Sequence, residues 1–262
     1  MSNLADMTQY LRKQAPSIFA TEPYGKMSDK YKFIPTIDVV EALGKEGFFP
    51  AKVTENRVRI QDKVGFAKHA IRFRNSDILP QVGDIIPEIV LVNSHDGTSA
   101  FQLSAGFYRL VCSNGMTVGN SEISVRQRHS GHIDSVIEGV FSVTEEFPAL
   151  TETVREWQGI ELTPSQQITF ARAALPLRWD ADTNGNYPVN PSHLIQPMRQ
   201  ADTKNDLWTT FNRIQEHVIK GGVRAVGSDG RRRRSKAVNS VNEDQRLNKA
   251  LWVLAAELAA TI

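Results

Sequence analysis

Apolar and polar residues alternate along several stretches between residues 48 and 129, which is the two-residue period of a β-strand. The dipeptides Asp96-Gly97 and Asn114-Gly115 separate such stretches, and both supply the positive φ angles of two-residue hairpin turns. These signals predict an antiparallel meander of about five or six strands. Before the meander we expect an N-terminal arm with a short helix near residues 5–14, and a second short helix that begins at Pro35.

After Ile133 the apolar spacing changes to three and four residues, the period of an α-helix. The apolar stripe continues past a break expected at Pro148. Thr163-Pro164-Ser165-Gln166 is a capping box that opens a further helix, and Gly221-Gly222 ends a helix that begins near Asn205. A last helix is expected over residues 243–260.

The predicted fold class is α+β, with an antiparallel sheet in the N-terminal half packed against helices mainly from the C-terminal half. Residues 1–132 would hold the arm, the short helix and the sheet, and residues 133–262 the helices. We expect the two parts to pack as one domain.

Two segments between the helices lack helical periodicity. Residues 177–191 form a turn-rich loop that we consider functional because polar groups and Trp179 cluster in it, and residues 221–240 are expected to be a mobile basic loop.

Positive charge is concentrated in two regions, although the net charge of the 262-residue chain is only +2. Residues 52–77 contain seven lysines and arginines against three acids, and residues 221–240 contain six against one. In the predicted strand at residues 66–75 one face is apolar, and the opposite face is cationic. The same split recurs at residues 57–60 and 125–128.

A sheet with this cationic face, covered by a flexible arginine loop, suits a nucleic-acid backbone. The predicted phosphate-binding residues are therefore Arg57, Arg59, Lys68, Arg72, Arg74, Arg126, Arg128, Arg231, Arg232, Arg233 and Arg234. The alternatives are an antiparallel sheet that simply exposes a charged face to water, and a solvated loop.

For the other candidate residues we favour structural roles. His129, His132 and Asp134 lie close in sequence as a metal or acid/base cluster would, but one short segment seldom provides a complete metal shell, and a polar turn explains them better. His69 lies on the apolar face of its strand and is interpreted as a hydrogen-bonded core histidine. Cys112 has no CxxC partner and is interpreted as a packing residue.

The helix expected over residues 205–220 has a polar face opposite its apolar stripe. Buried hydrogen bonds to a neighbouring loop are the favoured interpretation of that face, and a partner surface is the alternative. The polar face carries Asn205, Trp208, Thr209, Asn212 and Glu216.

Composition narrows the protein class. The single cysteine is incompatible with an internal disulfide framework, and no apolar run approaches the roughly 20 residues of a membrane helix. The N-terminus lacks the order of a signal peptide, so we expect a cytoplasmic protein that does not bind membranes. No Walker phosphate loop, GxSxG or HExxH motif is present, so we expect no enzyme of these classes, no metal and no cofactor.

Three segments together resemble a bacterial family of phage- and plasmid-borne proteins of unknown function: GFYRLVCSNGMTVG at 106–119, RQRHSGH at 126–132 and LWTTFNRIQEHVIKGG at 207–222. The opening APSIFATEPYGKMSDKYKFIPTIDVVEAL at 15–43 resembles the same family, so the likeness covers nearly the whole chain. It implies a mobile-element setting in a bacterial cell. In outline, the predicted fold is also similar to single-strand annealing proteins of the RecT and Erf kinds.

Three functional hypotheses follow. The first is a non-catalytic, homo-oligomeric protein that binds single-stranded DNA or another nucleic acid, for recombination or maintenance of a phage or plasmid. The second is an inhibitor that binds a protein of a host defence system. A metal-dependent activity at His129 and His132 is a third and minor hypothesis.

Overall fold

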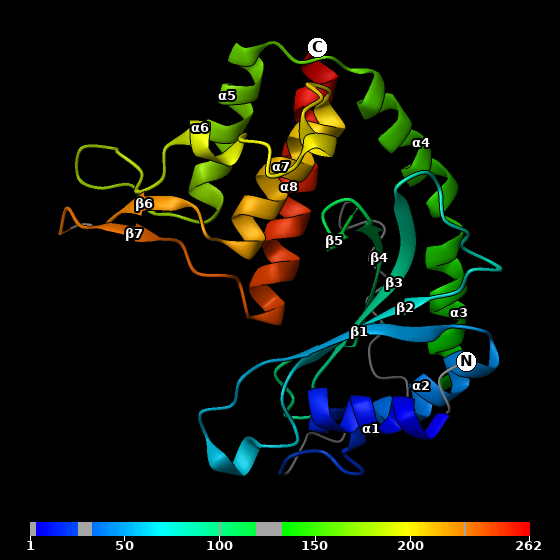
Figure 1. The fold of residues 1–262 in the computed structure, drawn as a ribbon. Helices are drawn as coiled ribbons and strands as arrows, with labels where there is room; N and C mark the ends of the chain where they lie inside the picture. The colour runs from blue at the N-terminus through cyan, green and yellow to red at the C-terminus, as the bar shows by residue number, and fades with distance from the viewer. Residues whose placement is uncertain (1–3, 26–32, 100, 119–132, 228) are drawn as a thin grey trace. The chain divides into compact units, whose positions relative to one another are not determined.

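Figure 1 shows the computed structural model of the chain, which describes residues 4–25, 33–99, 101–118, 133–227 and 229–262. Backbone contacts divide the chain into two units. The first unit comprises Met1–Tyr108 and Ser121–Phe147, and the second comprises Arg109–Asn120 and Pro148–Ile262.

A five-stranded antiparallel sheet, in the order β1-β2-β3-β4-β5, confirms the predicted meander and the α+β class. The turn predicted at Asn114-Gly115 lies at residues 110–113 instead, because the fifth strand already begins at Asn114. The strands are β1 (Phe49–Glu55), β2 (His69–Arg74), β3 (Ile85–Asn93), β4 (Gln102–Arg109) and β5 (Asn114–Thr117). The helices that belong to the first unit are α1 (Leu4–Gln14), α2 (Thr36–Lys45) and α3 (Ile133–Thr144).

The strand predicted at residues 57–60 is not formed. The pairing of β1 with β2 ends at Glu55 opposite His69, and residues 56–68 form a loop that contains a 3-10 turn. Ile60 is 57% exposed, so its alternation with the arginines buries no apolar face. An alternating pattern this short forms a strand only where a neighbouring strand is available to pair with it.

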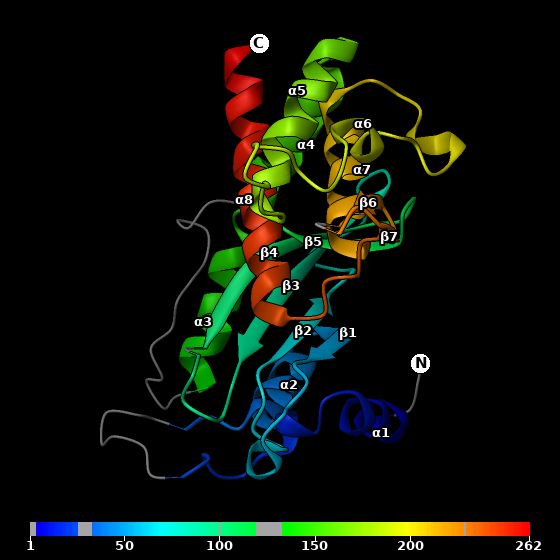
Figure 2. The ribbon, with the colours of Figure 1, turned by 90° about the vertical axis from the view of Figure 1, so that its left-hand side faces the viewer.

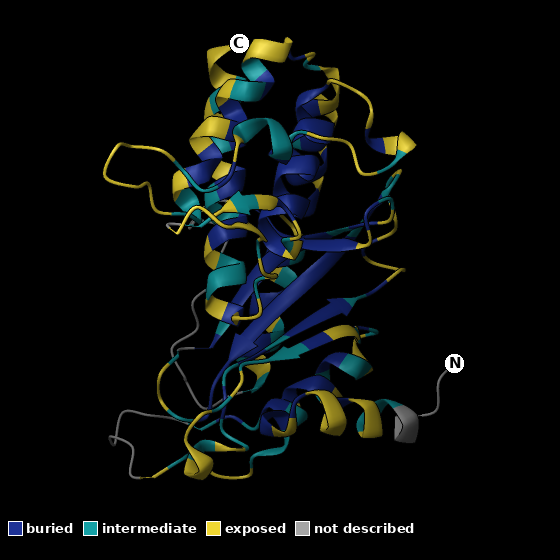
Figure 3. Cartoon of the chain, turned by 60° about the vertical axis from the view of Figure 1, so that its left-hand side comes forward, coloured by how far each residue is buried: buried dark blue, intermediate teal, exposed yellow. Residues whose placement is uncertain are grey.

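The apolar face of β2 supplies the core of the first unit. Ile71 and Phe73 are fully buried, as are Leu43 of α2 and Val140 of α3. The α2 helix packs against β1 and α3 (Figure 2), and β2 and β3 are buried along most of their length (Figure 3). Each such side chain contributes roughly 1.5–3 kcal/mol to folding.

A hydrogen-bonded polar cluster lies inside this core. His69 contacts the Ser17 hydroxyl through Nδ1 at 2.7 Å and the Thr36 hydroxyl through Nε2 at 2.9 Å. The Thr36 hydroxyl also contacts His95 Nε2 at 3.0 Å, and Ser17 binds the Glu55 carboxylate. The interpretation of His69 as a core histidine is confirmed. Burial, reinforced by the neighbouring His95, lowers the pKa of His69 to about 3.

The second unit is mainly helical and also contains a small two-stranded sheet. Its elements besides β5 are α4 (Phe147–Gly159), α5 (Pro164–Ala174), α6 (Pro191–Leu194), α7 (Leu207–Lys220), β6 (Arg224–Val226), β7 (Arg232–Arg234) and α8 (Val241–Thr261). The break at Pro148 is confirmed, because α3 ends at Thr144 and α4 begins at Phe147. The capping box at Thr163 is also confirmed, with both of its reciprocal hydrogen bonds formed.

The α7 helix is buried on all sides, including its polar face. The Gln215 amide accepts from Asn114 and donates to Asn248 at 2.7 Å, and Glu216 accepts two hydrogen bonds from Arg199, each 2.9 Å long. Asp202 in turn accepts from Arg199 at 2.6 Å. The predicted buried hydrogen bonds to a neighbouring loop are confirmed for Glu216. The Asn114–Gln215 hydrogen bond joins two of the segments that carry the family resemblance.

Candidate nucleic-acid interface

The arginines of the sheet are held by a buried carboxylate. Glu88 of β3 is fully buried, and its oxygens lie 3.2 Å from Arg72 Nη1 and 2.7 Å from Arg74 Nη2. The Arg74 guanidinium also stacks over the Tyr108 ring, 4.3 Å from its centroid. Arg72 is only 6% exposed. In this structure the charge of both arginines is thus partly balanced within the sheet.

The other predicted residues of the first unit lie outside the strands. Arg57 and Arg59 are exposed in the loop that follows β1. Lys68 directly precedes β2 and is partly buried. Burial lowers the pKa of Lys68, and the carboxylate of Asp96 opposes this change. Arg126 and Arg128 lie outside the described residues.

The run of four arginines forms part of a β-hairpin, whereas the sequence predicted an irregular loop here. β6 pairs antiparallel with β7, which places Arg224 opposite Arg234, Ala225 opposite Arg233 and Val226 opposite Arg232. The run's low apolar content was misleading, because backbone hydrogen bonds and a tight turn hold the segment and it needs no core of its own.

Backbone hydrogen bonds attach the hairpin to the rest of its unit. Val226 N–H donates to the Pro188 carbonyl at 2.8 Å, and Ser235 N–H donates to the Val223 carbonyl at 2.9 Å. Gly222 N–H donates to the Ser235 carbonyl at 2.8 Å. The hairpin is therefore joined both to the loop before α6 and to the end of α7.

Gly221 is required where α7 meets the hairpin. Its φ is +72°, and a Cβ there would lie 2.5 Å from the Lys236 carbonyl oxygen. We expect Gly221→Ala to lower the free energy of unfolding by about 2–3 kcal/mol, because the left-handed backbone and the collision add. Gly222→Ala is the matched control, since Gly222 has a φ of +76° but open space around it. Equal losses in urea denaturation would exclude the collision as a cause.

Asp229 organises the turn of the hairpin and takes up part of its charge. Its carboxylate accepts from the Arg231 N–H at 3.1 Å and from Arg233 Nη2 at 2.5 Å. Arg234 Nη1 donates to the Gly222 carbonyl at 2.7 Å. Among the described residues, no carboxylate forms an ion pair with Arg224 or Arg232. Arg234 has no carboxylate partner among the described residues either, so three guanidiniums of the hairpin lack an opposite charge.

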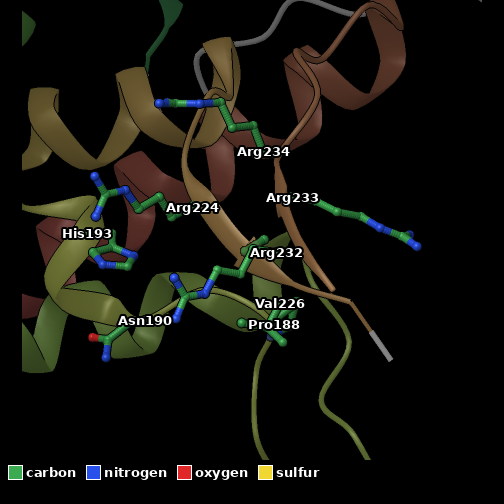
Figure 4. A pocket seen from close by; sticks show the side chains of 9 residues that line it. Pro188, Asn190, His193, Arg224, Val226, Arg232, Arg233 and Arg234 are labelled. Atoms are coloured by element: carbon green, nitrogen blue, oxygen red, sulfur yellow. The ribbon is translucent and has the colours of Figure 1, made fainter. Parts of the chain in front are cut away.

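An open pocket of about 820 Å³ lies between the hairpin and the α6 segment. In Figure 4, Arg224 and Arg232 extend to the same side of the hairpin, toward His193, and Arg233 extends to the other side. His193 Nδ1 is buried without a hydrogen-bond partner among the described residues. Among the described residues, the pocket lining contains no acidic side chain; it consists of Pro188, Asn190, His193, Arg224, Ala225, Val226, Arg232, Arg233 and Arg234.

Of the predicted residues, the pocket includes Arg232, Arg233 and Arg234, while Arg231 lies at the turn. Prediction from sequence missed Arg224, Asn190 and His193. The turn-rich loop at residues 177–191 was a signal for Asn190, but nothing in the sequence indicated that it meets an arginine hairpin that follows it by more than thirty residues.

The remaining candidates do not form a site in the described part of the chain. Cys112 is buried, and burial raises the pKa of its thiol, as expected for a packing residue. Within the described ranges, no three His, Cys, Asp or Glu side chains gather in a way that could hold a metal ion. His129 and His132 lie outside these ranges, and Asp134 is in α3. No described helix is both long enough and apolar enough to span a bilayer.

Comparisons with known proteins give the relationship of the whole chain. Residues 23–252 match the family described as "Domain of unknown function (DUF932)". The chain belongs to this DUF932 family. Two Escherichia coli K12 relatives, the UPF0380 proteins YafZ and YfjQ, are each 39% identical over 249 residues, which cover 95% of this chain and 89% of each relative. No solved structure matches the chain. The DUF932 match includes both the hairpin and the pocket.

Proposed function

We propose that this protein binds nucleic acid, with a preference for single-stranded DNA, and that the arginine hairpin is the main contact surface. The observation that carries the proposal is the pair of guanidiniums, Arg224 and Arg232, that face a pocket without a balancing carboxylate. The biological setting we propose is recombination or maintenance of a phage or plasmid, because the family resemblance implies a mobile-element setting.

The register of the hairpin supports an anionic ligand. Side chains directly opposite in an antiparallel pair lie on one face, so Arg224 and Arg234 are neighbours of like charge. Such a pair destabilises a sheet unless an anion lies between the two groups or their charges are otherwise dispersed. Arginine also suits phosphate better than lysine does, because its planar guanidinium donates two parallel hydrogen bonds.

The shape of the site favours a single strand over a duplex. The pocket is recessed between two chain segments, and its volume of about 820 Å³ is in the range of small-molecule sites. A nucleotide held in a stacked, paired duplex would have to leave its stack to enter such a recess, whereas a nucleotide of a single strand is free to do so. Single strands should therefore bind more tightly than duplexes of equal length.

The sheet arginines contribute less in this proposal than the hairpin does. Glu88 holds both Arg72 and Arg74, and a phosphate would have to compete with a buried carboxylate for them. Arg57 and Arg59 are exposed and can extend the cationic surface of the first unit.

A salt series with labelled oligonucleotides tests the proposal. We expect the double variant Arg224→Gln/Arg232→Gln to bind a single-stranded oligonucleotide at least tenfold more weakly than the unmodified protein at low salt. The slope of log K against log salt should fall by about 1.4, because each lost phosphate contact removes roughly 0.7 for a single strand. Fluorescence anisotropy measures both quantities.

The matched control is Arg155→Gln/Arg172→Gln, which removes the same charge from exposed positions on α4 and α5. It should change binding by less than threefold. An equal loss in both double variants would mean that only net charge matters, and the hairpin would no longer be the contact surface.

A further inference from the structure

Two guanidiniums, those of Arg224 and Arg232, and the imidazole of His193 line the pocket beside the hairpin. We propose that it binds a phosphate monoester, as carried by the end of a nucleic-acid strand. This inference rests on the proposed function and adds to it the chemical group that the site selects. An internal phosphodiester carries one negative charge, whereas a monoester carries about 1.5 to 2 at neutral pH and offers three acceptor oxygens.

Three donor side chains of two kinds, two guanidiniums and one imidazole, line the recess. Arg224 and Arg232 supply paired N–H groups from diagonal positions on the two strands of the hairpin (Figure 4). His193 comes from α6, on the opposite wall of the pocket. A group with three acceptor oxygens can accept from both guanidiniums and from the imidazole at once, which a diester with two free oxygens cannot do to the same extent.

The imidazole of His193 has one buried nitrogen without a partner among the described residues. Buried polar atoms in folded proteins almost always have a hydrogen-bond partner, and His193 Nδ1 has none among the described residues. The neighbouring Asn190 side chain does not provide one, because its Oδ1 accepts from the Ser192 backbone at 2.9 Å and from the Ser192 hydroxyl at 2.8 Å. Nδ1 itself has almost no accessible surface, so a ligand in the open pocket would contact the imidazole through Nε2.

The walls of the pocket favour a nucleotide over an isolated inorganic phosphate ion. Pro188, Ala225 and Val226 give the recess an apolar side, and Val226 is 51% exposed. Apolar surface of this kind accommodates a sugar or the face of a base beside the phosphate. The ligand that fits both sides is a nucleotide with a terminal phosphate, either at a strand end or free in solution.

Binding of three oligonucleotides of one sequence, with a 5′-phosphate, a 3′-phosphate or hydroxyls at both ends, tests the inference. We expect at least one phosphorylated form to bind the unmodified protein five- to tenfold more tightly than the hydroxyl form. Arg224→Gln and Arg232→Gln should each reduce this preference to less than twofold. Arg231→Gln is the matched control, since it removes a neighbouring charge at the turn and outside the pocket, and should leave the preference intact.

A nucleoside 5′-monophosphate, with the unphosphorylated nucleoside as its control, separates the two sources of the monoester. Saturable calorimetric binding of the monophosphate that is lost in Arg232→Gln, without binding of any oligonucleotide, would support the pocket with a free nucleotide as its ligand and overturn the proposed function. Salt-sensitive binding of all three oligonucleotides with equal affinity would do the reverse, because nucleic-acid binding would stand and the monoester site would be wrong. Absence of binding in every arm would overturn both.

Discussion

Replacing Glu88 with glutamine should lower the free energy of unfolding of the first unit by about 3–5 kcal/mol. Glu88 is fully buried and shared by Arg72 and Arg74, at 3.2 Å and 2.7 Å. Glutamine keeps the shape of the side chain but removes the negative charge, so the buried Arg72 guanidinium loses its counter-charge inside the protein. Urea denaturation followed by circular dichroism measures the change.

Glu152→Gln provides the matched control, because it makes the same substitution in an exposed ion pair. Glu152 lies 2.9 Å from Arg155, and their side chains are 59% and 61% exposed. An exposed pair of this kind contributes at most about 1 kcal/mol. A Glu88→Gln protein as stable as the control would show that the sheet arginines are not held by this carboxylate, and would return them to the candidate phosphate contacts.

Lowering the pH should destabilise the first unit already at pH values above the range in which its carboxylates titrate. The pKa of His69 is about 3 in the folded protein, against an ordinary value of 6.5, so the folded state requires the neutral imidazole. Below pH 6.5 the unfolded chain binds a proton that the folded chain does not. Stability is therefore complete above pH 6.5, falls as the pH decreases, and stops falling from this cause near pH 3.

The expected loss is up to 1.36 kcal/mol per pH unit, or roughly 4–5 kcal/mol over the whole range. Between about pH 4.5 and 6.5, where most carboxylates stay ionised, His69 should account for about 2–3 kcal/mol. His95, whose ring centroid lies 5.5 Å away, and Glu55, bound to the same Ser17 hydroxyl, are the titratable groups beside it. Urea denaturation at several pH values measures the slope.

His69→Gln should flatten the slope in this window, although the variant will be less stable at neutral pH. His193→Gln, in the second unit, is the control that should keep the slope. If the unmodified protein is equally stable at pH 4.5 and 6.5, His69 does not stay neutral in the folded state and the assigned pKa is wrong.

Local signals in the sequence were sufficient for most of the fold. The capping box at Thr163, the break before Pro148 and the alternation in β2 each depend on residues within one turn or one strand of each other. Such short-range patterns can be interpreted without knowledge of tertiary contacts. The fold class, the ends of α7 and the burial of His69 were therefore predicted correctly.

The predictions that were wrong concern residues whose partners are distant in sequence. Arg72 and Arg74 have the pattern of an exposed cationic face, but the pairing of β2 with β3 brings Glu88 against them. The pocket requires His193 of α6 and Arg224 of β6, which are distant in the sequence, to lie on facing walls. Alternation specifies which face a side chain occupies, and does not specify what lies on the neighbouring strand.

The arginines of β7 also affect how copies of this chain behave toward one another. β7 is the outer strand of its two-stranded sheet, since β6 already forms a bridge to Val189 on its other side. An outer strand with unpaired backbone groups is a template for edge-to-edge aggregation, and like charges in a row prevent a second copy from adding there. Variants that neutralise Arg232, Arg233 and Arg234 together would remove this protection, so their self-association must be measured by light scattering before any loss of binding is interpreted. Lysine substitutions keep the positive charge and the repulsion, and replace only the planar guanidinium with an ammonium group.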